Sequence, residues 1–501
     1  MRKFGWPTLA CVMISFLTAT ASAGDMKPIE VYRRCYIRMT RQIPDVGSAR
    51  YKAVEQGKKS PVDACMEVFD SAAFGSNGIM MNRTNAEAKR VVKTFNDLHV
   101  SWFQSKNYPG STLTHLVIDH EEPALYFTRA AFMPSEPIKS VLTLSYGLQG
   151  VRDQLSYPAE INDWDAQSIL TYKAEYPYAK EKVPVISYVG FQYNSSKNNF
   201  SQLPGLLIGT NNYQTVRAPA SVEVGALVGV KKAMMFNLPN FVPFRPGGDI
   251  NKVLATIAPK FPVNQHFGGG VLGSQSFLLA NANLGRHVVP HTYAQINRRI
   301  GARVFEDLLC HQLPTLDAGD VVQEVDLKSA FTFQTQQSCM RCHSTVDGLA
   351  TGLRNFVIFR TQQANPPNAG LEIEGMMRLT PMAGSSEWAL QQPVGKLHYR
   401  ENITRKIVKN VSFSSLADLG NHFASGNDFY LCAAKRYYQF FTGINVDLTE
   451  PAKASLDKYH QDLVVSLGQK LKSTQSVRTL IRDIIASEPF QTRNYLAERL
   501  Q

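Results

Sequence analysis

A short cysteine and histidine motif is the part of the sequence best suited to chemistry. Residues 336–348 read QQSCMRCHSTVDG, with Cys339 and Cys342 separated by two residues and His343 following directly. This C-x-x-C-H spacing is typical of covalent c-type haem attachment, because two thiols one helical turn apart can bond the two vinyl groups of a haem. The next residue presents an imidazole to the iron, so we predict that His343 is the proximal axial ligand.

Three other roles are open to the same cysteines. A thioredoxin-like dithiol would need the pair at the start of a helix in a strand–helix–strand unit, whereas a polar stretch precedes this pair. A structural zinc site would need a second ligand pair, and the sequence contains no second C-x-x-C. A plain structural disulfide between Cys339 and Cys342 is the third alternative. We favour one covalently bound haem c.

The first 23 residues have the pattern of a secretory signal peptide. Arg2 and Lys3 precede an apolar run over residues 9–17 and an Ala-Ser-Ala sequence that ends at Ala23. The apolar run is short for a membrane anchor. We therefore expect an exported protein in the periplasm or cell envelope of a bacterium, with no transmembrane segment after signal cleavage. Export fits covalent haem, which bacteria attach to such motifs outside the cytoplasm.

Composition indicates a globular protein of several domains. The chain has 501 residues, of which 44% are hydrophobic and 19% charged. Its formal net charge is +12, and the basic residues are spread along the chain rather than gathered in one block. A nucleic-acid partner is therefore not expected of this exported protein.

Four cysteines remain outside the motif once Cys11 leaves with the signal peptide. An oxidising compartment favours their pairing, and four cysteines allow three connectivities. We expect a Cys35–Cys65 disulfide, because both residues lie in one N-terminal stretch. That pairing leaves Cys310 to bond Cys432 and to tie the haem region to the C-terminal helices.

The elements that position the motif are predicted from the spacing of apolar residues. Ser60 and Pro61 have the types expected at a helix N-cap and first turn. The segment INRRIGARVFEDLLCHQLP predicts a helix that ends before Pro314, with Ile300 and Val304 on its apolar face. The expected fold is mainly α, in the haem region and the C-terminal helices, with a mixed α/β, loop-rich middle. The expected parts are the signal peptide (1–23), an N-terminal helical region (24–105), a mixed middle domain (106–262), a c-type haem region (263–400) and a C-terminal helical domain (401–501).

Residues from about 265 to 495 resemble the cytochrome-c-like proteins of planctomycetes, myxobacteria and related bacteria, which are built from adjoining domains of unknown function and carry one c-type haem motif. The resemblance rests on the glycine-rich stretch 268–286, the arginine-containing helix that follows, the haem motif and the C-terminal segments. It implies a haem protein with a cytochrome-c-like region. The reaction of these proteins is poorly defined, so the resemblance implies no named activity.

The match to this family continues beyond the pentad, with departures. The family follows its haem motif with Asp-Pro-Leu-Gly, and Asp347 and Leu349 match two of these four positions. Gly348 replaces the proline and Ala350 replaces the glycine. We expect these departures to change the geometry of a loop rather than haem attachment.

A second axial ligand would be needed by a six-coordinate electron carrier, and it is usually methionine or histidine. Three methionines lie in the loop-like stretch GMMRLTPMAG, residues 375–384. We favour Met382, because its neighbouring proline and glycine suit an irregular ligand loop. Met376 and Met377 are alternatives, although most methionines pack in protein cores. His398 is the next candidate.

These residues together predict an exported monohaem c-type cytochrome that binds haem iron and transfers electrons to an unidentified redox partner protein. A haem-dependent oxidoreductase of the peroxidase or oxidase kind is an alternative, and it would need an open distal site. The single haem motif counts against a c-type peroxidase, since many of these carry two. A non-haem envelope interaction protein, with a structural Cys339–Cys342 disulfide, is the third class.

Overall fold

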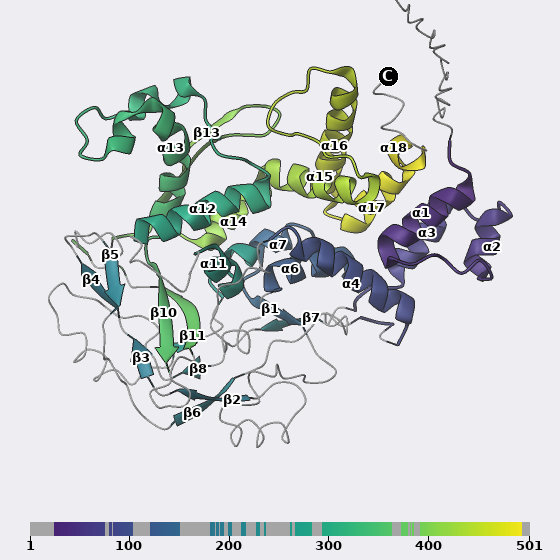
Figure 1. The fold of residues 1–501 in the computed structure, drawn as a ribbon, viewed down its shortest axis with the longest axis horizontal. Helices are drawn as coiled ribbons and strands as arrows, with labels where there is room; N and C mark the ends of the chain where they lie inside the picture. Colours follow the sequence, from purple (N-terminus) through teal and green to yellow (C-terminus); the bar gives the residue numbers. More distant parts are fainter. Residues whose placement is uncertain are drawn as a thin grey trace, which may run out of the picture.

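The computed structural model describes most of the chain outside the middle region. The described ranges are 25–75, 80–82, 84–103, 121–150, 266–282, 293–362, 372–378, 381, 383–384 and 391–492, together with short strands between 181 and 262. The expected signal peptide lies outside the described residues. The part that is described is mainly helical (Figure 1), which confirms the predicted fold class.

The N-terminal region forms helices as predicted. They are α1 (Pro28–Thr40), α2 (Ala49–Glu55), α3 (Pro61–Asp70) and α4 (Ala86–Val100). The Ser60 side chain accepts a hydrogen bond from the Asp63 backbone amide, so the predicted N-cap is confirmed. Asn85 caps α4 in the same way.

The C-terminal region is a second group of helices. They are α14 (Leu416–Ser425), α15 (Asp428–Thr442), α16 (Ser455–Thr474), α17 (Val477–Ala486) and α18 (Glu488–Gln491). Gly443 follows α15 with a positive φ of 81°, a conformation that favours glycine and ends the helix.

The two helical groups share one hydrophobic core, although hundreds of residues separate them in sequence. Figure 1 shows α1 and α3 beside α17 and α18. Arg478 forms two hydrogen bonds of 2.6 Å with the Asp70 carboxylate, and Arg482 contacts Asp63 at 3.0 Å. Core residues from α1 to α18 belong to a single cluster. The C-terminal helices therefore complete the hydrophobic core of the N-terminal helices.

A buried histidine connects these helices at the centre of the core. His99 of α4 is fully buried, with Nδ1 2.8 Å from the Thr128 hydroxyl and Nε2 2.7 Å from the Tyr437 hydroxyl. Thr128 belongs to α6 (Glu122–Phe132), and Tyr437 belongs to α15. Burial lowers the pKa of His99 to about 3, so the ring is neutral at ordinary pH.

The region around the cysteine motif combines helices with two hairpins. It contains α11 (Gln275–Asn281), α12 (Tyr293–Leu309), α13 (Gln337–Gly352), the antiparallel pair β10 (Phe356–Gln362) and β11 (Glu372–Arg378), and the antiparallel pair β12 (Gly395–Arg400) and β13 (Ile407–Phe413). Ile300, Val304 and Leu308 of α12 are buried, as their spacing predicts. The hairpins were not predicted from the sequence.

The β12–β13 hairpin packs against α13 through glycines. A Cβ atom on Gly352 or on Gly395 would collide with the Phe413 ring. A Cβ atom on Gly348 would lie 2.5 Å from the Lys396 carbonyl oxygen. Gly348 therefore lies inside a continuous helix that touches a strand, which corrects the expectation of a loop at this position.

Between 121 and 262 the described elements are short. They are α6, α7 (Ser140–Thr143) and the antiparallel strand pairs β1 (Gly147–Gly150) with β7 (Leu227–Val230), β2 (Glu181–Val185) with β6 (Asn212–Val216), β4 (Phe191–Asn194) with β5 (Asn199–Gln202), and β8 (Met235–Phe236) with β9 (Phe261–Pro262). The strand β3 (Ser187–Val189) pairs with β10, so the middle region adds a strand to the sheet formed by β10 and β11.

Two disulfides form in the pairs expected from the sequence. Cys35 of α1 bonds Cys65 of α3, with Cα atoms 6.2 Å apart. Cys310, directly after α12, bonds Cys432 of α15, with Cα atoms 5.2 Å apart. Both predicted pairings are confirmed. Among the residues described, we find no helix with the length and apolarity needed to cross a bilayer.

Candidate haem site

The cysteine motif lies in the first half of α13. Cys339 and Cys342 are both partly exposed, and both carry free thiols. Because an α-helix turns once in 3.6 residues, a spacing of three places both sulfur atoms near one side of the helix. The structure therefore presents two thiols outside any disulfide and the His343 imidazole along one partly exposed stretch of helix.

The next turn of α13 supplies a partner for His343. Nδ1 of His343 lies 3.2 Å from Oδ2 of Asp347, four residues later on the same helix. Within the described part of the chain, we find no protein atom bonded to Nε2. The ring is therefore held through Nδ1, and Nε2 is available for a ligand.

Helix α12 holds the Asp347 carboxylate from the other side. Nε of Arg298 donates to Oδ1 of Asp347, and Nη2 donates to Oδ2 at 2.9 Å. The two-pronged geometry fixes the plane of the carboxylate as well as its position. Asp347 is recognisable in the sequence as part of the family motif, but its contacts with Arg298 and His343 are visible only in the structure.

Phe333 contacts both His343 and Arg298. Its ring lies nearly parallel to the His343 imidazole, and the ring centroids are 4.2 Å apart. The Arg298 guanidinium lies over the same phenyl ring, 5.0 Å from its centroid. We call these four residues, Arg298, Phe333, His343 and Asp347, the His343 cluster. Each of its members contacts two of the others, so the imidazole is fixed on one face and at one nitrogen.

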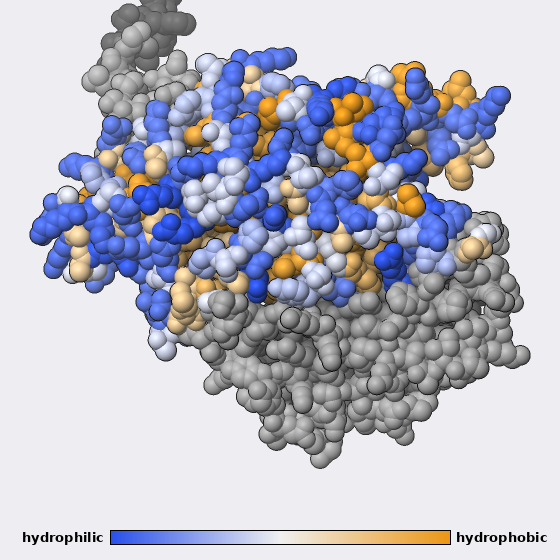
Figure 2. Space-filling model, turned by 180° about the vertical axis from the view of Figure 1, so that it is seen from behind, coloured by the Kyte–Doolittle hydropathy of each residue, from blue (hydrophilic) through white to orange (hydrophobic). Residues whose placement is uncertain are grey.

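The segment before α13 forms a small lobe beside the motif. This 316–336 lobe contains the 3-10 helices η4 (Ala318–Glu324) and η5 (Thr332–Thr335), and its own small core of Leu316, Val321 and Met340. Large apolar side chains of the lobe face solvent, with exposed fractions of 58% for Val322, 81% for Leu327 and 59% for Phe331. Among the coloured residues, the face drawn in Figure 2 is largely hydrophilic with separate hydrophobic patches.

The opposite side of α13 faces the β12–β13 hairpin. The Thr345 hydroxyl donates to the His398 carbonyl oxygen at 2.8 Å and lies 2.7 Å from the Thr315 hydroxyl. Successive helical residues are rotated by about 100°, so Thr345 lies about 160° around the helix from His343. The His398 side chain is buried, and its Nδ1 lies 3.0 Å from Glu324. His398 is therefore placed behind the helix that carries His343.

The candidate methionine ligands are only partly covered by the structure. Met382, the favoured second ligand, lies outside the described residues. Met376 and Met377 belong to strand β11, which corrects their expected place in a loop. The Met376 side chain is fully buried in the main core, and its backbone exchanges two hydrogen bonds with the Gln275 side chain. Met376 is therefore a packing residue.

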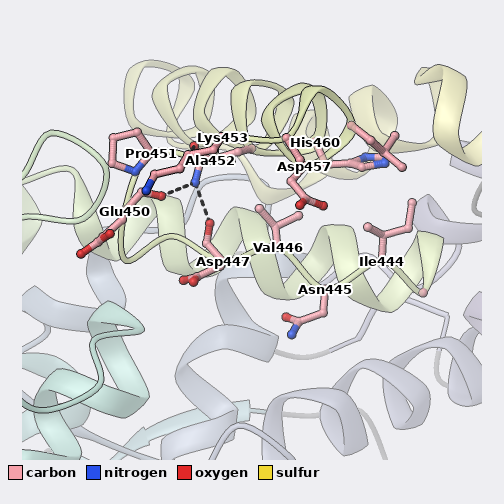
Figure 3. A pocket seen from close by; sticks show the side chains of 14 residues that line it. Ile444, Asn445, Val446, Asp447, Glu450, Pro451, Ala452, Lys453, Asp457 and His460 are labelled. Atoms are coloured by element: carbon pink, nitrogen blue, oxygen red, sulfur yellow. Dashed lines mark hydrogen bonds between the residues drawn. The ribbon is translucent and has the colours of Figure 1, made fainter. Parts of the chain in front are cut away.

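A pocket elsewhere in the molecule does not contain the motif. It measures about 700 Å³ and lies between the end of α15 and the start of α16 (Figure 3). The Gln461 side chain donates to the carbonyl oxygens of Asp447 and Glu450, at 2.9 and 2.7 Å. It also accepts from the Ala452 amide at 2.8 Å. The buried Gln461 amide, which lines this pocket, thus holds the loop together. Acidic, histidine and cysteine side chains form no metal-binding cluster within the described ranges.

The residues of α13 fit a covalently attached haem on three observations. Neither thiol is in a disulfide, the His343 imidazole has one engaged and one available nitrogen, and apolar side chains of the 316–336 lobe face solvent. A haem is a large, mainly apolar group, and covering such side chains is favourable. Burial raises the pKa of the Cys342 thiol, which is the opposite of the shift that activates a redox dithiol.

Comparison of the chain with protein-family models, with curated proteins and with solved structures gives no match.

Proposed function

We propose that the chain is an exported monohaem c-type cytochrome that transfers electrons. Cys339 and Cys342 would hold the haem through thioethers, and His343 would bind the iron through Nε2. The observation that carries this proposal is the pair of free thiols on α13, next to an imidazole already anchored at Nδ1 by Asp347. Haem bound there supplies an iron that gains and loses one electron at a time.

The protein's own residues would orient and shield this group. Asp347 and Phe333 limit rotation of the imidazole. Exposed apolar residues of the 316–336 lobe, such as Leu327 and Phe331, would cover part of the haem. The signal-peptide pattern of residues 1–23 and the family resemblance support a periplasmic or envelope location and an unidentified redox partner protein. We propose Met382 as the second ligand on the sequence argument alone.

Expression with a bacterial haem-attachment system tests this proposal. We expect the intact mass of the mature protein to include one haem, and the reduced-minus-oxidised spectrum to show c-type bands. The double variant C339A/C342A should lose the covalent haem. Met340→Leu is the matched control, because Met340 lies between the two cysteines but packs into the small core of the lobe. Wild-type protein without covalent haem would overturn the proposal.

A haem-dependent oxidoreductase is the second candidate function, and one observation favours it. A carboxylate that accepts a hydrogen bond from a ligand histidine makes the ligand more basic, so the iron receives more electron density. Asp347 has this relation to His343. Binding of carbon monoxide, or a spectral change on addition of peroxide, would favour the enzyme. Haem that binds neither would favour the electron carrier.

A further inference from the structure

We infer that Asp347 is a positioning residue that selects the tautomer of His343 and sets the donor strength of its free nitrogen, and that Arg298 moderates this effect. The inference rests on the proposed function for its redox consequence. Its geometric part concerns the protein alone. It begins from the His343 cluster, in which a carboxylate lies between a guanidinium and an imidazole.

In the hydrogen bond between His343 and Asp347, the imidazole is the donor and the carboxylate is the acceptor. The Arg298 guanidinium can only donate, and it engages both oxygens of Asp347, so this carboxylate is an acceptor toward its neighbours. Nδ1 of His343, 3.2 Å from Oδ2, must therefore carry the proton. A neutral imidazole with its proton on Nδ1 has its lone pair on Nε2, the nitrogen that can bind a metal.

Phe333 also fixes the orientation of the imidazole that carries this tautomer. An imidazole that is free to rotate could exchange its two nitrogen atoms by turning over. The phenyl ring lies 4.2 Å from the imidazole centroid at an angle of 23°, and it is itself covered by the Arg298 guanidinium. Turning the imidazole would break the Asp347 hydrogen bond and this ring contact together. Nε2 is thus directed away from Asp347.

Arg298 and Asp347 have opposite effects on the electron density at Nε2. The carboxylate draws the Nδ1 proton toward itself and so increases electron density at Nε2. The guanidinium shares the negative charge of the same carboxylate, which weakens its pull on the proton. A more electron-rich ligand stabilises the oxidised iron. Loss of Asp347 should therefore raise the reduction potential, and loss of Arg298 should lower it.

The first test needs no haem. The full-length mature variant C339A/C342A, labelled with ¹⁵N histidine, would be compared with the same protein carrying Asp347→Asn or Asp347→Ala. The His343 signal is assigned by its loss in His343→Gln. We expect the Nδ1-protonated tautomer to predominate while Asp347 is present, and the Nε2-protonated tautomer to increase in Asp347→Ala. Unchanged tautomer populations would overturn the inference.

The second test measures the reduction potential of the haem-loaded protein. We expect a higher potential in Asp347→Asn and a lower potential in Arg298→Gln. Asp347→Glu keeps the charge but moves the carboxylate by one methylene, so its potential should shift toward that of Asp347→Asn. A potential in Asp347→Glu equal to wild type would show that charge alone acts, which would overturn the hydrogen-bond role.

Asp317→Asn is the matched control for the loss of one negative charge. Asp317 lies at the start of η4 in the same part of the molecule, and its carboxylate contacts Arg400 and Arg405 rather than His343. It should keep the wild-type potential, and a shift as large as that of Asp347→Asn would contradict the inference. Wild-type protein without haem would overturn the proposed function, while the tautomer experiment would still decide the role of Asp347. If Asp347→Asn does not fold, the direction of the shift in reduction potential in Arg298→Gln decides the inference, and a potential that is not lowered would overturn it.

Discussion

The Phe333 ring lies against the His343 imidazole at an angle of 23°, and this contact joins the 316–336 lobe to the helix that carries both cysteines. Phe333 also packs against the small core formed by Leu316, Val321 and Met340. One aromatic side chain thus contributes both to the folding of the lobe and to the orientation of the candidate ligand.

Replacing Phe333 by alanine should loosen the lobe. Phe333 is half-buried, so we expect the substitution to cost about 1–3 kcal/mol locally, less than a fully buried phenylalanine. Backbone amides of η4 and η5 should then exchange hydrogen roughly tenfold faster or more, which mass spectrometry can measure. Phe331→Ala removes the same group from a side chain that is 59% exposed, and it should leave exchange unchanged. Equal effects of the two variants would contradict this interpretation.

Adding a methyl group at Gly352 should destabilise the contact between α13 and the β12–β13 hairpin. The new Cβ atom would collide with the Phe413 ring and would lie 3.2 Å from the Cα atom of Gly395. Overpacking of this kind costs about 1–3 kcal/mol, more than the helix propensity gained from alanine. Thermal unfolding should show a lower Tm for Gly352→Ala. Gly319→Ala is the control, because nothing lies within 4 Å of its added Cβ atom.

Acid should destabilise the core through His99. The pKa of this buried ring is lowered to about 3, while an unfolded histidine titrates near pH 6.5. Between these values the unfolded chain binds the proton and the folded protein does not, so stability falls as the pH is lowered from 6.5 toward 3. The limit of this contribution is on the order of 5 kcal/mol.

The variant His99→Gln isolates this contribution. Glutamine can still bond the hydroxyl groups of Thr128 and Tyr437 but cannot gain a proton in this range. Its free energy of unfolding, measured from pH 7 to pH 3, should fall less steeply than that of wild type. Parallel curves for the two proteins would show that His99 does not carry the acid sensitivity.

The two disulfides should differ in their contribution to stability. The Cys310–Cys432 bond joins residues 122 positions apart, and the Cys35–Cys65 bond joins residues 30 apart. Loop-closure entropy in the unfolded chain gives about 5 kcal/mol for the longer loop and about 4 kcal/mol for the shorter. The double variant C310S/C432S should therefore lose more thermal stability than C35S/C65S. The reverse order would indicate that the N-terminal bond is needed for packing.

Local signals in the sequence were sufficient for several of the helices, while the disulfide pairs were expected by elimination among four cysteines. Ser60 before Pro61 marks the start of α3, and the apolar spacing of Ile300 and Val304 identifies α12. Each depends on residues within a few positions of one another. The hairpins depend on pairing at a distance, as when β3 of the middle region joins β10. No local pattern reveals such a partner, so Met376 and Met377 were wrongly placed in a loop.

The candidate site was predictable only in part for the same reason. Cys339, Cys342 and His343 are adjacent in sequence, and their spacing identifies them. Asp347 could have been connected to His343 by the four-residue helical spacing, had the helix been extended through Gly348. Arg298 and Phe333 come from other elements, and nothing in the sequence indicates that they meet at the imidazole.

The small separate core of the 316–336 lobe has an evolutionary consequence. The lobe begins shortly after Cys310, whose disulfide fixes the chain to α15, and it ends where α13 begins. Apart from Met340, its core residues come from the lobe and the residues beside it rather than from the main core. Mutations at exposed positions such as Leu327 can therefore accumulate without disturbing the packing of the helical body. Descendants of this chain could change the environment of His343, and with it the choice of partner, on a fold that stays constant.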